Sequence, residues 1–189
     1  MPDPDQGPTD PEAIARLLVL RKLAAAPRTR HQLHQHLVDR GIPEDVSGRV
    51  LDRFGELGYV DDVTYARDWV QSRHRSRALA RTVIRRELRE RGIAPEIAEQ
   101  ALTQISQEAE LQRAREFAAR KAQRLVDVES AVAVRRLSGA LVRKGYHWSV
   151  ALTAAQDALH GRSGDPDGNS SCEESFDGGL YVIDHSQGG

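Results

Sequence analysis

Apolar residues recur at intervals of three and four positions through most of residues 12–160. This spacing places them on one face of an α-helix, and glycine follows several of the runs, where it closes a helix at little cost. Thr29 and Gln32 form a Thr-x-x-Gln capping box, which predicts a helix start near residue 30. Only 5% of the chain is aromatic and 39% is hydrophobic, which suits narrow helical stripes better than a sheet sandwich. We therefore predict an all-α protein.

One pattern of apolar positions, built around a basic residue and a glycine, occurs three times along the chain. Its copies are Leu33, Leu37, Arg40, Gly41, Ile42, Val46, Val50 and Leu51, then Ile84, Leu88, Arg91, Gly92, Ile93, Ile97, Ala101 and Leu102, then Leu137, Leu141, Lys144, Gly145, Tyr146, Val150, Ala154 and Ala155. The three glycines are 51 and 53 residues apart. Each copy predicts two helices joined by a glycine turn.

A further helix is predicted before each of these hairpins, at residues 12–25, 62–74 and about 107–126. Since two helices leave an apolar face open, the third helix is expected to pack across it. We predict three tandem three-helix units of helix-turn-helix character, at about residues 12–57, 62–105 and 107–160. Together they would form an elongated array.

Residues 1–11 and 161–189 lack this periodicity. The first segment contains four prolines among acidic residues, and the second is dominated by Gly, Ser, Asp and Asn. Neither composition can offset the entropy of ordering through burial, so both are predicted to be disordered tails. The apolar residues 180–183 are interpreted as part of the tail rather than as a short docking peptide.

The formal net charge of -1 conceals an uneven distribution. Residues 1–12 hold four acids and no base, and residues 161–189 hold six acids and one base. Residues 13–160 therefore hold 26 bases and 18 acids, a net charge of +8. A basic body between acidic ends predicts an acidic partner, with nucleic acid or a nucleoprotein as the leading candidates.

Neither a membrane span nor an export signal is predicted. No stretch approaches the roughly 20 consecutive apolar residues of a span, and the acidic, proline-rich start does not fit a signal peptide. The single cysteine, Cys172, has no partner for an intramolecular disulfide. We expect a cytoplasmic protein.

The most specific motif joins the first predicted unit to the second. It runs Leu57-Gly58-Tyr59-Val60-Asp61-Asp62-Val63-Thr64-Tyr65-Ala66 and continues through Trp69-Val70 to Arg73. This segment resembles the signature of the RecX family. In physical terms, Gly58 can end one helix, Asp61 or Asp62 can cap the next, and Tyr65, Ala66, Trp69 and Val70 form its buried stripe.

Two further stretches are similar to the same family. They are Ile84-Arg85-Arg86-Glu87-Leu88-Arg89-Glu90-Arg91-Gly92-Ile93, and residues 114–124 with Lys121 at their centre, followed by residues 137–146. The resemblance spans about residues 12–160. It departs from the family at Arg75-Ser76-Arg77-Ala78-Leu79, which replaces a Gly-rich basic turn, and at Gln32, where Glu is common. The acidic tails have no place in it.

The resemblance implies a function for the chain. It implies a non-catalytic regulator that lies in the groove of the RecA–DNA filament and spans neighbouring RecA subunits. Such a protein suppresses strand exchange and ATP hydrolysis by RecA in recombinational DNA repair. We expect it to act as a monomer and to bind free DNA weakly if it binds it at all.

Eight arginines lie between Arg73 and Arg91. On a helix beginning near residue 79, three of them, at 81, 85 and 89, form one stripe, while Ile84 and Leu88 lie on the other side. Arginine suits phosphate and carboxylate because its planar fork makes two hydrogen bonds. The predicted contacts to the partner or DNA are Arg73, Arg75, Arg77, Arg81, Arg85, Arg86 and Arg89. The alternative is a solvated face on which Glu87 and Glu90 pair with these arginines.

No constellation for metal binding or catalysis stands out. His31, His34 and His36 lack the further ligands that structural zinc requires, so we interpret them as surface histidines. There is no glycine-rich phosphate loop. Trp69 and Trp148 could stack on bases, but both occupy apolar-periodic positions and are predicted to anchor the core. We therefore predict no cofactor, no metal and no enzymatic activity.

A helix-turn-helix transcriptional regulator is the second hypothesis. Such a protein reads the major groove with Asn, Gln or Arg near the start of a recognition helix, and it usually dimerises. Here the basic residues form a long side stripe, and the unit is repeated in tandem. This arrangement favours a long nucleoprotein surface over a short operator.

Overall fold

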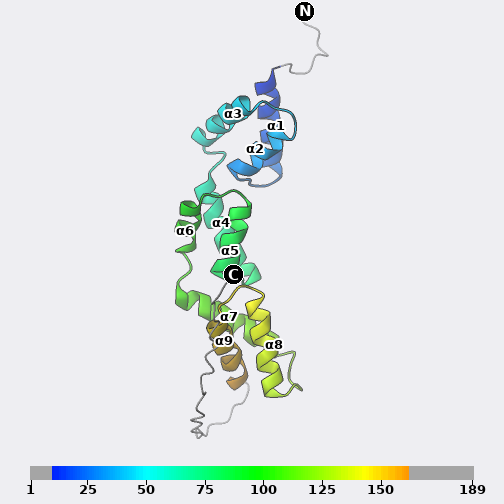
Figure 1. Ribbon diagram of the computed structural model, residues 1–189, viewed down its shortest axis with the longest axis vertical. Helices are drawn as coiled ribbons and strands as arrows, with labels where there is room; N and C mark the ends of the chain where they lie inside the picture. The colour runs from blue at the N-terminus through cyan, green and yellow to red at the C-terminus, as the bar shows by residue number, and fades with distance from the viewer. Residues whose placement is uncertain (1–9, 162–189) are drawn as a thin grey trace, which may run out of the picture.

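The computed structural model describes residues 10–161, and every regular element in this range is a helix. The helices are α1 (Pro11–Ala25), α2 (Arg30–Val38), α3 (Glu44–Glu56), α4 (Asp62–Arg77), α5 (Arg81–Glu90), α6 (Pro95–Leu102), α7 (Gln107–Ala122), α8 (Ser130–Val142) and α9 (Trp148–His160). They form three groups of three, stacked along an elongated molecule (Figure 1). The all-α tandem array is confirmed. We refer to α1–α3, α4–α6 and α7–α9 as the first, second and third units.

The predicted tails lie almost wholly outside the described residues. The exceptions are Asp10 and Pro11, which cap and begin α1, and Gly161, which caps the end of α9. Proline is tolerated at the start of α1 because its missing amide would have no helical partner. The carboxylate of Asp10 accepts the amide of Glu12 and caps the helix.

The predicted caps are present at the starts of two helices. The hydroxyl of Thr29 accepts the amide of Gln32 at 3.2 Å, and the Gln32 side chain accepts the amide of Thr29 at 3.3 Å, which confirms the capping box. At α4 the cap is Asp61 rather than Asp62, because Asp61 accepts the amides of Val63 and Thr64. Asp62 is therefore available for another contact.

The repeated glycine turn is confirmed in all three units. Gly41, Gly92 and Gly145 have φ values of +76°, +73° and +89°, a conformation that glycine adopts without steric cost. In each turn the next amide bonds back to the carbonyl five residues earlier, as in Ile42 to Leu37 at 3.1 Å. This bond is part of a Schellman motif and satisfies a free carbonyl at the helix end.

Each unit buries its own core, and the repeated apolar positions form it. The residues in these positions with almost no exposed surface include Leu33, Leu37, Leu51, Ile84, Leu88, Leu102, Leu137 and Leu141. The third unit also buries many alanines, including Ala114, Ala118, Ala151 and Ala154, which lets α7 and α9 approach closely. The strongest helix contacts lie within the units.

Two details of the third unit differ from prediction. α7 ends at Ala122 rather than near residue 126, because the amides of Arg124 and Leu125 turn back to carbonyls only three residues earlier. Trp148 was predicted to anchor the core, but its side chain is 56% exposed at the first position of α9. Trp69 is half-buried against the core of the second unit.

Candidate functional site

The seven predicted contact arginines lie on α4 and α5 of the second unit and do not form one uniform surface. Arg75 and Arg77 are exposed in the last turn of α4. Arg81, Arg85, Arg86 and Arg89 lie on α5, whose opposite face carries the buried Ile84 and Leu88. Arg73, in contrast, points inward between the two helices, and its side chain is only 16% exposed.

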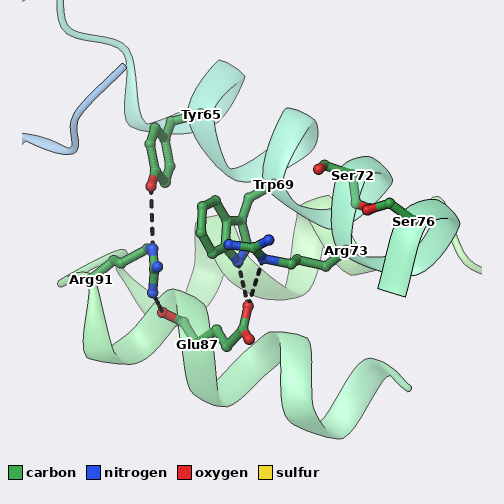
Figure 2. A network of polar contacts seen from close by, with 7 residues as sticks. All are labelled: Tyr65, Trp69, Ser72, Arg73, Ser76, Glu87 and Arg91. Atoms are coloured by element: carbon green, nitrogen blue, oxygen red, sulfur yellow. Dashed lines mark hydrogen bonds and ion pairs between the residues drawn. The ribbon is translucent and has the colours of Figure 1, made fainter. Parts of the chain in front are cut away.

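Arg73 belongs to a network that joins α4 to α5 (Figure 2). Its Nε donates to a carboxylate oxygen of Glu87 at 3.1 Å, and the same oxygen accepts the indole N–H of Trp69 at 2.8 Å. The guanidinium groups of Arg73 and Arg91 each lie 3.7 Å from the centroid of the Trp69 ring. The network therefore fixes the orientation of α5, and Arg73 is a positioning residue within it.

Tyr65 extends this network towards the start of α4. Its ring stacks on Trp69 with centroids 5.8 Å apart, and its hydroxyl accepts Nε of Arg91 at 3.2 Å (Figure 2). Cation–π contacts of this kind contribute about 0.5–2 kcal/mol each, more where they are shielded from water. The motif that carries the family resemblance thus supplies the side chains that hold α5 in place.

The arginine stripe of α5 is partly neutralised by nearby acids. Arg85 forms a two-pronged ion pair with Glu99 of α6. Its Nε donates to Oε1 of Glu99, and its Nη2 donates to Oε2 at 3.0 Å. Hydrogen bonding between them lowers the pKa of Glu99 and raises that of Arg85. Arg86 lies 3.7 Å from Glu90. Arg89 has no ion pair among the described residues and is exposed.

The predicted alternative, in which Glu87 and Glu90 pair with the stripe, is correct for only one of the two acids. Glu90 approaches Arg86, but Glu87 turns towards α4 and bonds Trp69 and Arg73. The pairing of Arg85 with Glu99 was missed. Only the packing of α6 beside α5 brings these two side chains together.

Two similar joints connect the units and position the arginines along the array. In the first joint the backbone amide of Arg30 donates to Asp62 at 2.9 Å, and in the second the amide of Arg81 donates to Glu110 at 2.8 Å. Each bond therefore caps the second helix of one unit with an acid from the first helix of the next. Asp62, predicted as a possible cap for α4, caps α2 instead.

The glycine turns pack into the same joints. A Cβ atom built on Gly92 would lie 2.2 Å from Cγ of His31, and one built on Gly145 would lie 2.4 Å from Cγ2 of Val83. His31 and Val83 both lie in the first turn of the second helix of the preceding unit. The backbone approaches so closely that no side chain fits, which favours a fixed spacing between units.

Residues 10–161 contain neither a cluster of metal ligands nor a membrane-spanning helix. No group of three or more His, Cys, Asp and Glu side chains in this range could hold a metal ion. Within the same residues no helix is long and apolar enough to cross a membrane. His31 packs beneath Gly92, and burial together with Lys22 and Arg40 lowers the pKa of His36.

Sequence reasoning also missed a second basic cluster, formed where the second and third units meet. It consists of Arg77, Arg120, Lys121, Arg124 and Lys144. Arg120, Lys121 and Arg124 are neighbours in sequence, but Arg77 and Lys144 lie far from them, so local spacing could not bring all five together. The +8 charge of residues 13–160 was the only available signal.

Known proteins share both the sequence and the fold of this chain. Family models described as the first and second three-helix domains of RecX match residues 15–54 and 61–102. The chain is similar to the regulatory protein RecX of Streptomyces coelicolor, with 41% identity over 152 residues, covering 80% of this chain and 81% of that protein. It is also 41% identical over 158 residues to RecX of Thermobifida fusca, covering 84% and 85% of the two chains.

Solved structures support the same fold. The crystal structure of RecX from Lactobacillus salivarius aligns with a TM-score of 0.72 and 22% identity, covering 81% of this chain and 99% of that one. A second crystal structure of regulatory protein RecX aligns with a TM-score of 0.68 and 24% identity, covering 78% and 74%. With about 40% identity to its relatives over four-fifths of its length, the chain belongs to the RecX family of regulatory proteins.

Proposed function

We propose that this protein binds the RecA–DNA filament and restrains strand exchange and ATP hydrolysis, without catalysing a reaction itself. Membership of a family of regulatory proteins supports a regulatory role. The observation that carries the proposal is the elongated array with two repeated joints and a basic body. Such an array presents a long positive surface at fixed spacing, which suits a periodic acidic nucleoprotein better than a small ligand.

The contact surface in this proposal is the exposed part of α5, together with the end of α4. Arg81, Arg85, Arg86 and Arg89 face the partner, with Arg75 and Arg77 beside them. Arg89 is the first candidate because it is exposed and has no ion pair within the described residues. Arg73 contributes through Trp69 and Glu87, by holding α5 in place.

The proposal also specifies how the chain acts. The units at about residues 12–57, 62–105 and 107–160 contact successive positions along the filament. The protein acts as a monomer, in the cytoplasm, without a cofactor or metal. It therefore changes the rate of ATP hydrolysis by occupying RecA, and its effect saturates at a fixed ratio of protein to filament.

The test is DNA-dependent ATP hydrolysis by the cognate RecA with increasing amounts of this protein. We expect hydrolysis to fall, and we expect the triple variant R81Q/R86Q/R89Q to need about tenfold more protein, from three lost contacts of roughly 0.5 kcal/mol each. Arg85 is kept in this variant because it braces α6 through Glu99. The control is R21Q/R40Q/R67Q, which removes three exposed positive charges elsewhere.

Both triple variants should keep the helical spectrum and unfolding midpoint of the wild type. If the wild-type protein leaves RecA unaffected, the proposed function is wrong. Tight binding of one particular duplex in that case would support the transcriptional regulator instead. If the two triple variants inhibit equally, the α5 surface is not the contact.

A further inference from the structure

A basic groove opens where the second and third units meet, with a volume of about 650 Å³. The end of α4, one edge of α5, the C-terminal half of α7 and the turn before α9 contribute its walls. Its cations are Arg77, Arg120, Lys121, Arg124 and Lys144, whereas Glu87 is the only carboxylate that residues 10–161 contribute to its lining. Because Glu87 is already bonded to Trp69 and Arg73, it does not neutralise the groove.

Four of the five cations are available to a ligand. Arg77, Arg120, Lys121 and Arg124 are exposed, and none of them forms an ion pair with an acid in residues 10–161. The α5 stripe differs, since Arg85 and Arg86 both have acidic neighbours. Positive charge without acidic partners in the described chain therefore gathers at this joint.

Lys144 connects the two sides of the groove. Its Nζ donates to the backbone carbonyl of Arg77 at 2.6 Å and lies 4.8 Å from the centroid of the Phe117 ring. Burial lowers its pKa, and the positive charges of Arg77 and Lys121 lower it further. Lys144 thus spans the joint, and its neighbours are close enough to concentrate positive potential there.

We propose that this groove binds the phosphodiester backbone of DNA, with Arg77, Arg120, Lys121 and Arg124 contacting phosphate oxygens. The charged groups that line the groove are mainly hydrogen-bond donors, and its acceptors already hold partners, since Glu87 Oε2 accepts from Trp69 and Arg73 and the carbonyl of Arg77 accepts from Lys144. A nucleic-acid backbone presents only acceptors there, which matches the donors. An acidic peptide matches these donors less completely, since each of its residues also carries an amide N–H, which is a donor facing a wall of cations.

Apart from Arg77, which borders both, this site is separate from the surface proposed to contact RecA. Val83 and Glu87 line the groove, and each lies two residues from Arg85 on α5. Two residues correspond to about half a turn of an α-helix, so the groove and the arginine stripe occupy different edges of α5. The inference does not depend on RecA, and it holds or fails with free DNA alone.

The test is fluorescence anisotropy of the full chain with a labelled 20-nucleotide single strand and with the corresponding duplex, without RecA, between about 50 and 200 mM salt. In the variant R120Q/K121Q/R124Q all three substituted residues are exposed, and the control R21Q/R40Q/R67Q carries the same change in charge. We expect the groove variant to bind at least about tenfold more weakly, with a shallower salt dependence, because each lost phosphate contact removes about 0.7–0.9 from the slope. The control should remain within about twofold of the wild type.

Equal losses in the two triple variants would overturn the proposal, because DNA would then sense only net charge. Unlabelled competitors identify the ligand class. We expect DNA to displace the probe at a much lower phosphate concentration than tripolyphosphate, and polyglutamate of equal charge to displace it poorly. Equal displacement by tripolyphosphate would indicate a small-anion site, and better displacement by polyglutamate an acidic-peptide site, and either result contradicts the proposal.

The same variants separate this inference from the proposed function. The groove variant is assayed for RecA inhibition, and R81Q/R86Q/R89Q is assayed for binding to free DNA. We expect R81Q/R86Q/R89Q to lose RecA inhibition while its affinity for free DNA stays within about twofold of the wild type. If the protein has no effect on RecA, the proposed function is wrong but the DNA-binding groove is unaffected. If the groove variant binds DNA as well as the wild type, only the groove proposal is wrong.

Discussion

The hydroxyl of Thr29 donates a hydrogen bond of 2.7 Å to the backbone carbonyl of Arg91, 62 residues further along the chain. Thr29 is fully buried, and its oxygen also accepts the amide of Gln32 at the start of α2. One side chain therefore caps its own helix and secures the first joint. In the second joint the backbone amide of Ala80 takes the equivalent role and donates to the carbonyl of Lys144 at 3.0 Å.

We predict that Thr29→Val destabilises the protein by about 2–3 kcal/mol, because it removes a helix cap and leaves the carbonyl of Arg91 without its donor. Valine keeps the shape of threonine, so packing changes little. The measurement is the free energy of unfolding in urea. Thr103→Val is the control, since the Thr103 hydroxyl is exposed and bonds only a carbonyl in its own turn. Similar losses in the two variants would contradict the role of Thr29.

Alanine at the three equivalent glycines should have unequal effects. In Gly41→Ala the new Cβ atom has no neighbour within 4 Å, so the protein loses only the cost of a left-handed alanine, about 1–2 kcal/mol of folding stability. Gly92→Ala and Gly145→Ala have the same conformational cost, and their Cβ atoms collide with His31 and Val83. We expect a further loss of about 1–3 kcal/mol from this overpacking. Urea unfolding measures the loss of free energy in each variant, and small-angle X-ray scattering reports any change in the geometry of the joint. Equal losses at all three positions would refute the close packing at Gly92 and Gly145.

The two tryptophans should report different environments. In Trp148→Phe the remaining Trp69 lies against two guanidinium groups and is half-buried, so we expect blue-shifted emission and weak quenching by acrylamide. In Trp69→Phe the remaining Trp148 is exposed and should be quenched readily. The second substitution also removes the bond to Glu87, with an expected cost of about 1–2 kcal/mol. Matching quenching constants would contradict the different exposures of the two side chains.

The cap at Asp61 should make stability depend on pH. Hydrogen bonds from the hydroxyl and amide of Thr64 and the amide of Val63 lower the pKa of Asp61 below its ordinary value of 3.8. Because the folded-state pKa is depressed, the ionised cap stabilises the protein above pH 3.8, and this contribution is lost as the pH falls through the folded-state pKa.

The comparison that isolates this effect is between the wild type and Asp61→Asn. Asparagine also caps helices, but it carries no charge. We expect the variant to be less stable at pH 7, and we expect the difference in the free energy of unfolding to shrink as the pH falls below 3.8. Urea titrations at several pH values measure this difference. A constant difference at every pH would show that the charge of Asp61 contributes nothing.

Local features of this chain were predictable because they depend on neighbours within one helical turn. The glycine turns at Gly41, Gly92 and Gly145, the capping box at Thr29 and the buried repeat positions all follow from such spacing. A cap or a periodic stripe requires only residues within four positions, and backbone geometry alone then decides its form. The predicted end of α7 near residue 126 was wrong, because residues in a helix end and in the turn after it have similar composition and spacing does not separate them.

The sequence alone thus determined the all-α tandem array, its helix starts and its excess of positive charge. The tertiary structure decided which charges are compensated. It turned Arg73 inward to Glu87, paired Arg85 with Glu99, and gathered Arg77 and Lys144 across 67 residues of chain. The physical reason is that an ion pair or a groove needs side chains from helices whose approach is set by packing between them. Periodicity describes the face of each helix and says nothing about which other helix will meet it.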